Sequence, residues 1–514
     1  MTNWVILPII LPAMLAPFIV LAARHHIGIQ RVFSVAGVLA LVAISAGLAW
    51  QAADGTVLLY RLGDWAAPYG IVVVADRLST LMILLTAVLA FFVLLYAIGS
   101  GWDDRGWHFH ALFQFQLMGL MGAFLTGDLF NLFVFFEVLL IASYGLMIHS
   151  GGNARLRAGV QYVLYNLLGS TLFLFALGAI YAETGTLNMA DLAERVRLID
   201  PGASVGIRIA SVLLLLVFAI KAALVPLHFW LPSSYAEAPA PAAALFAIMT
   251  KVGAYAIIRV YTMIFPPDLE VTAGMYGLWL LPAALVSLAV GMMGVLAARR
   301  LDRLVAFAVI GSMGMVMIAI SLFTPAGIAA ALYYIVHSTL AAAALFLIAD
   351  LARAGRDNLR LTAQPPVSGA ALTAALFFIG AIAMTGLPPL SGFLGKLLIL
   401  DAAFATPLMV WTWAVVLSAS LVSVMGFARA GSTLFWKPVA IGHPPAETRA
   451  PPPGALSYVA VGGLLSLLIA YTVFAGPLYQ YLGITATRLF EADRYISTVL
   501  GTPGKLSDGK TEAY

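Results

Sequence analysis

Residues 376–400 read LFFIGAIAMTGLPPLSGFLGKLLIL. The run is almost wholly apolar, is long enough to cross the roughly 30 Å hydrocarbon core of a bilayer as a helix, and contains one charge, Lys396. Gly386, Pro388 and Pro389 interrupt it, because proline cannot continue the hydrogen-bond pattern of a helix. The stretch therefore predicts a membrane-spanning helix that is broken near its middle.

The whole chain has a membrane composition. Of its 514 residues, 62% are hydrophobic and 10% are charged, whereas soluble domains average roughly 25% charged residues. A net charge of +4 without a basic run disfavours nucleic-acid binding, and the lack of cysteine excludes disulfides, thiolate metal sites and cysteine nucleophiles. No P-loop or dinucleotide fingerprint is present, so we expect one continuous helical membrane domain with no cofactor and no bound metal.

Runs of spanning length recur along the chain. About 20 apolar residues cross the hydrocarbon core as a helix, and fourteen segments meet this requirement. They are Val5–Ala23, Val32–Trp50, Leu78–Ile98, Phe109–Leu125, Leu129–Ile148, Gly159–Ala182, Ile209–Trp230, Ala240–Met263, Met275–Ala298, Leu304–Phe323, Gly327–Ala349, Ala370–Ala405, Met409–Thr433 and Leu456–Phe474. The first is expected to be a span, because no basic residue precedes it as a signal peptide would require. The sequence therefore predicts an all-α polytopic membrane protein with about 14 transmembrane helices.

Two of the fourteen runs contain helix breakers at corresponding places. The seventh, Ile209–Trp230, contains Pro226 and is followed by Pro232, and the twelfth contains the interruption quoted above. Paired interrupted spans are typical of transporters built from internal repeats, with binding sites near the membrane midplane. Proline kinks in helices without a transport role remain the alternative.

The loop charges predict an orientation, because lysine and arginine near helix ends concentrate on the cytoplasmic side. Loops after odd-numbered runs carry fourteen such residues and loops after even-numbered runs carry six, while the stretch after Phe474 adds four. Both termini are therefore expected to face away from the cytoplasm. Residues Pro477–Val499 mix apolar and charged positions and predict an amphipathic helix at the membrane interface.

A few ionisable residues lie inside the apolar runs, each well away from the membrane surfaces. An acid or lysine at a helix centre costs roughly 2.5–3.5 kcal/mol even on the lenient insertion scale, so a functional role is favoured. A structural ion pair between one acid and one lysine is the alternative, but it would leave two further cations without an acid partner. The residues are Glu137, Lys221, Lys251, His337 and Lys396.

These groups are suited to stepwise proton transfer. Burial disfavours the charged form of each group and an adjacent opposite charge restores it, so making or breaking one pair can load or release a proton. Hydroxyls and imidazoles nearby could extend a water chain. The further candidates are His228, Tyr144, Tyr333, Tyr334, Ser338 and Thr339. For His228, seven residues after Lys221, an interfacial histidine at a helix end is slightly favoured over a relay role. His108, His110, Asp103 and Asp104 are expected to form a solvated loop cluster rather than a metal site.

Two stretches resemble a known family. They are TGDLFNLFVFFEVLLIASY (Thr126–Tyr144) and FAIKAALVPLHFWLP (Phe218–Pro232), and they are similar to the antiporter-like subunits shared by respiratory complex I and Mrp-type multisubunit cation/proton antiporters. The resemblance implies fourteen core helices with two inverted five-helix repeats and discontinuous helices 7 and 12. It assigns Glu137 and Lys221 as a coupled pair, Lys251 as the connecting lysine, His337 as a relay and Lys396 as the terminal lysine.

The same resemblance implies a division of the chain and a functional class. The expected parts are 1–107 (helices 1–3), 108–263 (first repeat), 264–433 (second repeat), 434–477 (helix 14) and 478–514 (amphipathic tail). The motif Gly392–Lys396 most resembles D-type subunits of Mrp antiporters, which implies a non-enzymatic Na⁺/H⁺ antiport role with other subunits as partners in a bacterial cytoplasmic membrane. A proton-pumping subunit of complex I or a related hydrogenase, and a scaffold without transport activity, remain the alternatives.

Overall fold

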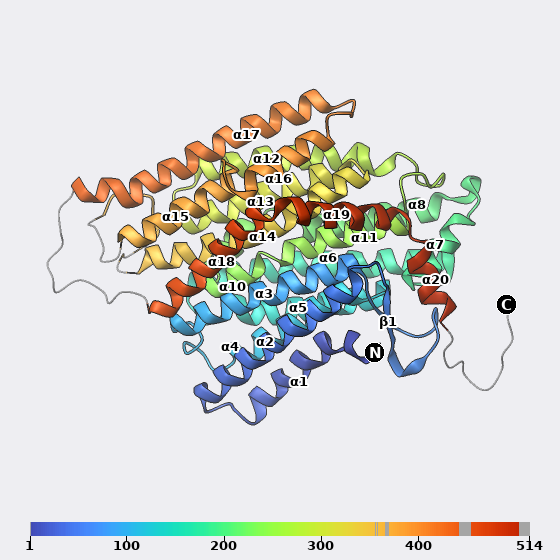
Figure 1. Ribbon diagram of the computed structural model, residues 1–514, viewed down its shortest axis with the longest axis horizontal. Helices are drawn as coiled ribbons and strands as arrows, with labels where there is room; N and C mark the ends of the chain where they lie inside the picture. Colours follow the sequence, from blue (N-terminus) through green and yellow to red (C-terminus); the bar gives the residue numbers. More distant parts are fainter. Residues whose placement is uncertain (1, 355, 357, 365–369, 441–453, 503–514) are drawn as a thin grey trace.

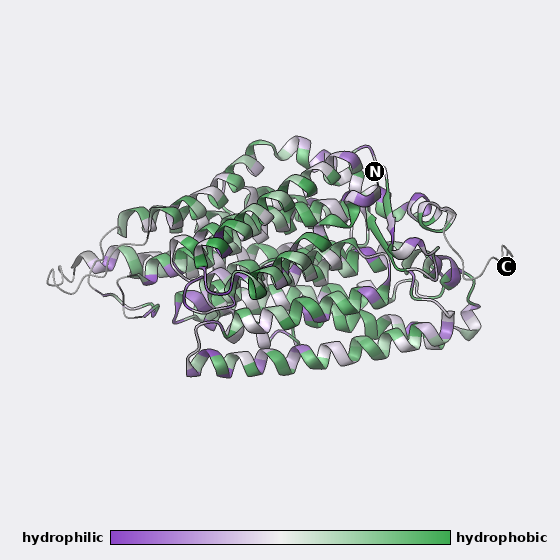
Figure 2. Cartoon of the chain, turned by 90° about the horizontal axis from the view of Figure 1, so that it is seen from below, coloured by the Kyte–Doolittle hydropathy of each residue, from purple (hydrophilic) through white to green (hydrophobic). Residues whose placement is uncertain are grey.

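The computed structural model describes residues 2–354, 356, 358–364, 370–440 and 454–502. The chain forms a bundle of long helices that run roughly along one direction, with the N-terminus and the last helix, Asp493–Gly501, toward the same end of the bundle (Figure 1). Hydropathic colouring shows apolar residues along the helices and hydrophilic residues concentrated near their ends (Figure 2). This distribution is what a bilayer requires of a polytopic protein.

Each of the fourteen predicted runs coincides with one helix or with a pair of helices. In chain order the helices are α1 (Leu7–Leu21), α2 (Ile27–Ala52), α3 (Arg77–Gly99), α4 (Phe109–Leu125), α5 (Leu129–Met147), α6 (Asn153–Thr184), α7 (Met189–Arg197), α8 (Val205–Lys221), α9 (Trp230–Glu237), α10 (Ala240–Phe246), α11 (Met249–Met263), α12 (Met275–Ala297), α13 (Leu301–Ser321), α14 (Pro325–Arg353), α15 (Ala370–Thr385), α16 (Ser391–Ala402), α17 (Met409–Gly431), α18 (Ala455–Val473), α19 (Ala475–Phe490) and α20 (Asp493–Gly501). Among the described residues, ten segments are long and apolar enough to cross a membrane, and α1, α4 and α15 are shorter apolar helices. The predicted polytopic helical fold is confirmed, and the inverted repeats stay a prediction.

Both predicted interruptions are present. Residues 222–229, which include Pro226, separate α8 from α9, and residues 386–390, with Gly386, Pro388 and Pro389, separate α15 from α16. Pro232 differs from the prediction, because it lies in the first turn of α9 rather than in the break. A first turn tolerates proline, since its backbone N–H groups have no partner inside the helix.

A smaller irregularity, a two-residue turn that keeps helical backbone angles, was not predicted. The run Ala240–Met263 is divided into α10 and α11, with Ala247 and Ile248 between them. Neither residue is proline or glycine, so the sequence carries no local signal for this irregularity. It lies immediately before the turn that holds Lys251.

Smaller elements lie outside the long helices. Strands β1 (Leu58–Arg61) and β2 (Val72–Ala75) pair antiparallel, with Leu58 opposite Ala75, and α7 is a short helix between α6 and α8. None of these was predicted. The tail forms α19 and α20, but α19 packs against α14 and α11, and the ring of Tyr479 lies 6.4 Å from that of Tyr333. The start of α19 therefore packs against the central helices, and the interfacial location of the tail stays a prediction.

Three helices form the centre of the bundle. Every residue of α11 is buried, and α13 and α14 are buried along nearly their whole length. By contrast, α2, α6, α12 and α17 keep broad apolar faces exposed. The candidate residues Lys251 and His337 lie on the central helices, so their polar groups are shielded from lipid.

Candidate functional site

Glu137 lies near the middle of α5. The helix begins after Asp128, whose carboxylate accepts a hydrogen bond from the Asn131 backbone N–H at 2.8 Å, the ordinary capping role. Nine residues separate Asp128 from Glu137, which is about 13 Å of helix. The Glu137 side chain is half-buried, and the hydroxyl of Ser170 on α6 donates a hydrogen bond to its Oε1.

Lys221 is the last residue of α8 and lies directly before the break. It is 8% exposed, and its Nζ lies 3.5 Å from Oδ1 of Asn166 on α6. A Cβ atom on Gly169 would lie 3.9 Å from Cε of Lys221 and 3.3 Å from Ile220. The glycine thus lets α6 approach the C-terminal end of α8 closely.

The helix α6 supplies hydrogen-bond partners to both members of the predicted coupled pair. Ion pairs within 4 Å in the described part of the chain involve arginines and His110, and none involves Glu137 or Lys221. Instead Asn166 contacts Lys221 and Ser170 contacts Glu137. The two are four residues apart and therefore share one face of α6, so this face holds the acid and the lysine as separate, hydrogen-bonded groups.

Lys251 is completely buried in the first turn of α11. Its Nζ lies 3.5 Å from the hydroxyl of Thr250, and no carboxylate lies within ion-pair distance among the described residues. The helix α11 packs against α8 on one side and α14 on the other. Lys251 thus lies on the helix that connects the helix of Lys221 with the helix of His337.

His337 is completely buried on α14. Its Nδ1 forms a 2.9 Å hydrogen bond with the hydroxyl of Ser391, the first residue of α16 after the break. A Cβ atom on Gly392 would lie 2.9 Å from Nε2 of His337 and 2.0 Å from the carbonyl oxygen of Ala383. The absence of a side chain at Gly392 therefore allows the start of α16 to reach the imidazole.

Lys396 is held by the broken helix itself. Its Nζ donates to the carbonyl oxygen of Thr385 at 2.6 Å and to the hydroxyl of Ser420 at 2.8 Å. Thr385 ends α15, and the last carbonyls of a helix lack partners and carry partial negative charge. Gly386 has φ +71°, and a Cβ there would lie 2.7 Å from Cδ of Lys396, so glycine is required at this point for two reasons.

The structure brings few of the further candidates to these groups. The Tyr334 ring centroid lies 5.3 Å from that of His337, whereas the ring of Tyr333 faces Tyr471 on α18 at 4.7 Å. The hydroxyls of Ser338 and Thr339 both donate to the backbone carbonyl of Ile335. These two hydroxyls satisfy their own helix and do not extend from the imidazole.

The two candidates near the first break have separate surroundings. Tyr144 packs its ring against Tyr162 of α6, with centroids 5.5 Å apart. His228 lies inside the break and is 8% exposed, and its Nδ1 has no hydrogen-bond partner among the described residues. His228 is therefore enclosed by protein rather than placed at a solvated helix end.

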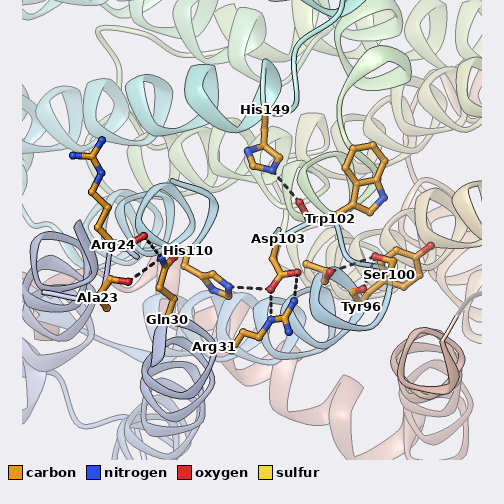
Figure 3. A network of polar contacts seen from close by, with 11 residues as sticks. Ala23, Arg24, Gln30, Arg31, Tyr96, Ser100, Trp102, Asp103, His110 and His149 are labelled. Carbon is orange, nitrogen blue, oxygen red and sulfur yellow. Dashed lines mark hydrogen bonds and ion pairs between the residues drawn. The ribbon is translucent and has the colours of Figure 1, made fainter. Parts of the chain in front are cut away.

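The loop before α4 differs from its prediction as a solvated cluster. Asp103 is fully buried, and its carboxylate accepts hydrogen bonds from Arg31 on α2 at 2.6 and 3.0 Å and contacts His110 on α4 at 3.2 Å (Figure 3). Burial alone would raise the pKa of Asp103, but the hydrogen bonds from His110 and Arg31 hold it below its ordinary value. The described residues contain no group of three or more potential metal ligands, so this network fastens α2 to α4.

A second buried ion pair was also missed by sequence reasoning. Arg259 of α11 donates to both carboxylate oxygens of Asp76 at 2.7 Å and to the hydroxyl of Ser79 at 3.1 Å. Asp76 also caps α3 through the backbone N–H of Ser79. The pair fixes the start of α3, directly after β2, against the central helix α11.

Comparisons with known proteins agree with this architecture. A sequence profile described as NADH:quinone oxidoreductase/Mrp antiporter, TM, matches residues 126–423. The D subunit of the Na(+)/H(+) antiporter of Bacillus subtilis (strain 168) is 38% identical over 97% of this chain and 100% of its own length. The D subunit of a probable K(+)/H(+) antiporter of Rhizobium meliloti (strain 1021) is 36% identical over 98% of this chain and 99% of its own length.

A solved structure extends the likeness to the fold. A chain of the Mrp complex from Dietzia sp. DQ12-45-1b superposes with a TM-score of 0.87 at 27% identity, covering 98% of this chain and 100% of that chain. The profile covers more than half of the residues, and the relatives match from end to end. The chain therefore belongs to the NADH:quinone oxidoreductase/Mrp antiporter family of membrane subunits, with D-type subunits among its relatives.

Proposed function

We propose that this chain is the D-type, proton-translocating subunit of a multisubunit monovalent cation/proton antiporter. Protons move along Glu137, Lys221, Lys251, His337 and Lys396 near the membrane midplane. The observation that carries the proposal is the environment of the three buried lysines, which have carbonyl, hydroxyl and amide oxygens as partners. A lysine with neutral partners can gain or lose a proton without breaking an ion pair.

The helices that carry these groups form a continuous path. Helix α6 packs against both α5 and α8, α8 packs against α11, α11 against α14, and α14 against α16. Breaks in the helices lie beside Lys221 and Lys396, and a two-residue turn precedes the helix of Lys251. Interrupted helices in membranes are found where they line polar or water-filled sites. The order of the packed helices supports a transfer from Glu137 toward Lys396.

The surroundings of Glu137 support partner subunits. Its side chain is half-buried in this chain alone, and Ile141, one turn further on the same helix, is 66% exposed. A carboxylate at the midplane that faces lipid is costly, so another antiporter subunit covers this part of α5. The exchanged monovalent cation is Na⁺, the complex lies in the bacterial cytoplasmic membrane, and both termini face away from the cytoplasm.

The role is transport and not chemical catalysis. The relatives over the full length of the chain are antiporter subunits, and the proposed groups transfer only protons. Members of the wider family in redox complexes rely on electron-carrying chains, and nothing in this chain's described residues favours that assignment over antiport.

The test is Na⁺-dependent proton flux in everted vesicles that contain the complete complex. Glu137→Gln and Lys396→Ala should each abolish exchange while the complex still assembles. Lys437→Ala, which removes an exposed lysine outside the path, is the matched control and should exchange at the native rate. Native rates in both Glu137→Gln and Lys396→Ala would contradict the proposal and favour a scaffold.

A further inference from the structure

An apolar cavity of about 600 Å³ lies between α2, α3, α14 and the bend between α18 and α19. The described residues that line it include no charged side chain. On one wall, Ala46 and Ala49 of α2 and Ala53 directly after it recur every three or four residues and leave space that larger side chains would fill. The opposite wall bends at Phe474, between the end of α18 and the start of α19. A cavity of this size and lining suits a hydrocarbon rather than water.

The distance from Arg77 to the far end of the cavity matches one leaflet of a bilayer. Along α3 the lining runs from Leu81 to Val88, and Val88 lies eleven residues from Arg77 at the start of the helix, which is about 16 Å and close to half of the hydrocarbon thickness. Trp50 and Phe474 line the cavity and are 84% and 60% exposed. The cavity is therefore open to the surroundings of the bundle.

Arg77 does not line this cavity, but it contacts two residues that do, Ala53 and Tyr481. Its guanidinium donates to the carbonyl oxygens of Ala53 after α2 and Tyr481 on α19, and to the hydroxyl of Thr485 at 2.9 Å. It also lies 3.8 Å from the centre of the Tyr481 ring. The arginine thus joins the start of α3 to the end of α2 and to α19.

A polar cavity of about 250 Å³ lies on the other side of Arg77. Arg77, Arg488 and Arg494 line it together with two carboxylates, Asp76 and Glu491. Asp76 is already paired with Arg259, so the positive charges exceed the remaining negative one. Nη2 of Arg488 donates to the carbonyl oxygen of Asp54 at 3.0 Å. Nη1 packs against Gly55 and has no hydrogen-bond partner among the described residues, so a shift of this side chain would offer a donor to an anion.

We propose that these two cavities together bind one anionic phospholipid. An acyl chain occupies the apolar cavity, and the phosphate lies beside Arg488 and Arg494. The match of depth to one leaflet and of positive charge to the outer end favours a lipid over a transmembrane helix of another subunit, which would cross both leaflets. The bound lipid ties α2 and α3 to the α18–α19 bend and covers Val336 and Leu340, which flank His337 on α14.

The experiment measures lipid bound to the purified complete complex by native mass spectrometry. After delipidation, the complex is titrated with phosphatidylglycerol and, separately, with phosphatidylethanolamine. The delipidated native complex should bind one added phosphatidylglycerol per copy of this chain and should bind phosphatidylethanolamine more weakly. Arg488→Gln should weaken phosphatidylglycerol binding about fivefold, since one cation near a lipid surface contributes about that factor, and Ala49→Phe should block the acyl chain.

A control variant on the same helix shows whether lipid binding is lost because the cavity is filled or because any added bulk on α2 weakens it. Ala36→Phe places the same added volume on an exposed part of α2 outside the lining and should bind lipid as the native complex does. Assembly is checked by size-exclusion chromatography, and Arg488→Gln keeps the test valid if Ala49→Phe does not assemble. Three results would each overturn the proposal. They are equal binding of the two lipids, unchanged lipid binding in Arg488→Gln, and a helix of another subunit in the apolar cavity of the assembled complex.

Discussion

The face of α6 that separates Glu137 from Lys221 should control the rate of exchange. We expect Asn166→Leu and Ser170→Ala to slow Na⁺/H⁺ exchange, because each removes the hydrogen-bond partner of one charged group. In the observed arrangement, neither charge has an oppositely charged partner within 4 Å among the described residues. These two hydrogen bonds therefore stabilise the separated state.

The size of the effect follows from the two contacts. A hydrogen bond to a charged group contributes about 1.5–3 kcal/mol, and each 1.4 kcal/mol corresponds to about tenfold in rate. The Lys221–Asn166 contact is long at 3.5 Å, so its free energy lies near the lower end of this range. Asn166→Leu should therefore lower the exchange rate about tenfold. Ser170→Ala should lower the exchange rate between about tenfold and 100-fold.

The assay is initial-rate exchange in everted vesicles across a range of pH, with expression and assembly measured in parallel. Both variants should change the pH profile as well as the rate, because each alters the environment of one titrating group. Thr171→Ala is the matched control, since this adjacent hydroxyl is exposed and bonds to the backbone of its own helix. Rates within about twofold of native in both variants, or an equal loss in Thr171→Ala, would refute the reasoning.

Three further predictions concern other contacts. Gly386→Ala should abolish exchange in vesicles while the complex still assembles, because the new Cβ at φ +71° would displace the Lys396 side chain from its position; normal exchange would contradict this. Asp76→Asn should lower the stability of the purified complex by about 3–5 kcal/mol, because Arg259 loses its buried partner, and an unchanged melting temperature would show the pair to be dispensable. Because the pKa of Asp103 is lowered in the folded state, its contribution to stability is complete above its ordinary pKa of 3.8 and is lost as the pH falls through the folded-state value. Asp103→Asn should therefore make the free energy of unfolding depend less on pH in acid. Thermal melts of native and variant complex between pH 5 and pH 2 measure this.

The sequence alone was sufficient where a feature depends on local chemistry. A run of about 20 apolar residues can satisfy its backbone in lipid only as a helix, so the fourteen runs were visible without coordinates. The breaks after α8 and α15 were visible because Pro226, Pro388 and Pro389 cannot continue a helix. The buried ionisable residues were visible because charge inside an apolar run is rare and costly.

Other local features left no usable signal. The two-residue turn before the helix of Lys251 contains neither proline nor glycine, and Pro232 was misplaced because a first turn accepts proline as readily as a break does. Asp103 and His110 were expected to be solvated, since the sequence does not show that Arg31, seventy-two residues away, closes over them.

The partners of the buried groups were decided only by tertiary structure. Asn166, Ser170, Ser391 and Ser420 are ordinary polar residues on apolar helices, and nothing near them in the chain indicates that they contact Lys221, Glu137, His337 and Lys396. A helix sequence fixes which residues share a face, but the face that meets a given neighbour depends on how helices pack, which is a property of the whole bundle. The sequence therefore determined which groups must be buried. The packing determined that, among the described residues, neutral hydrogen-bond partners rather than opposite charges lie within 4 Å of them.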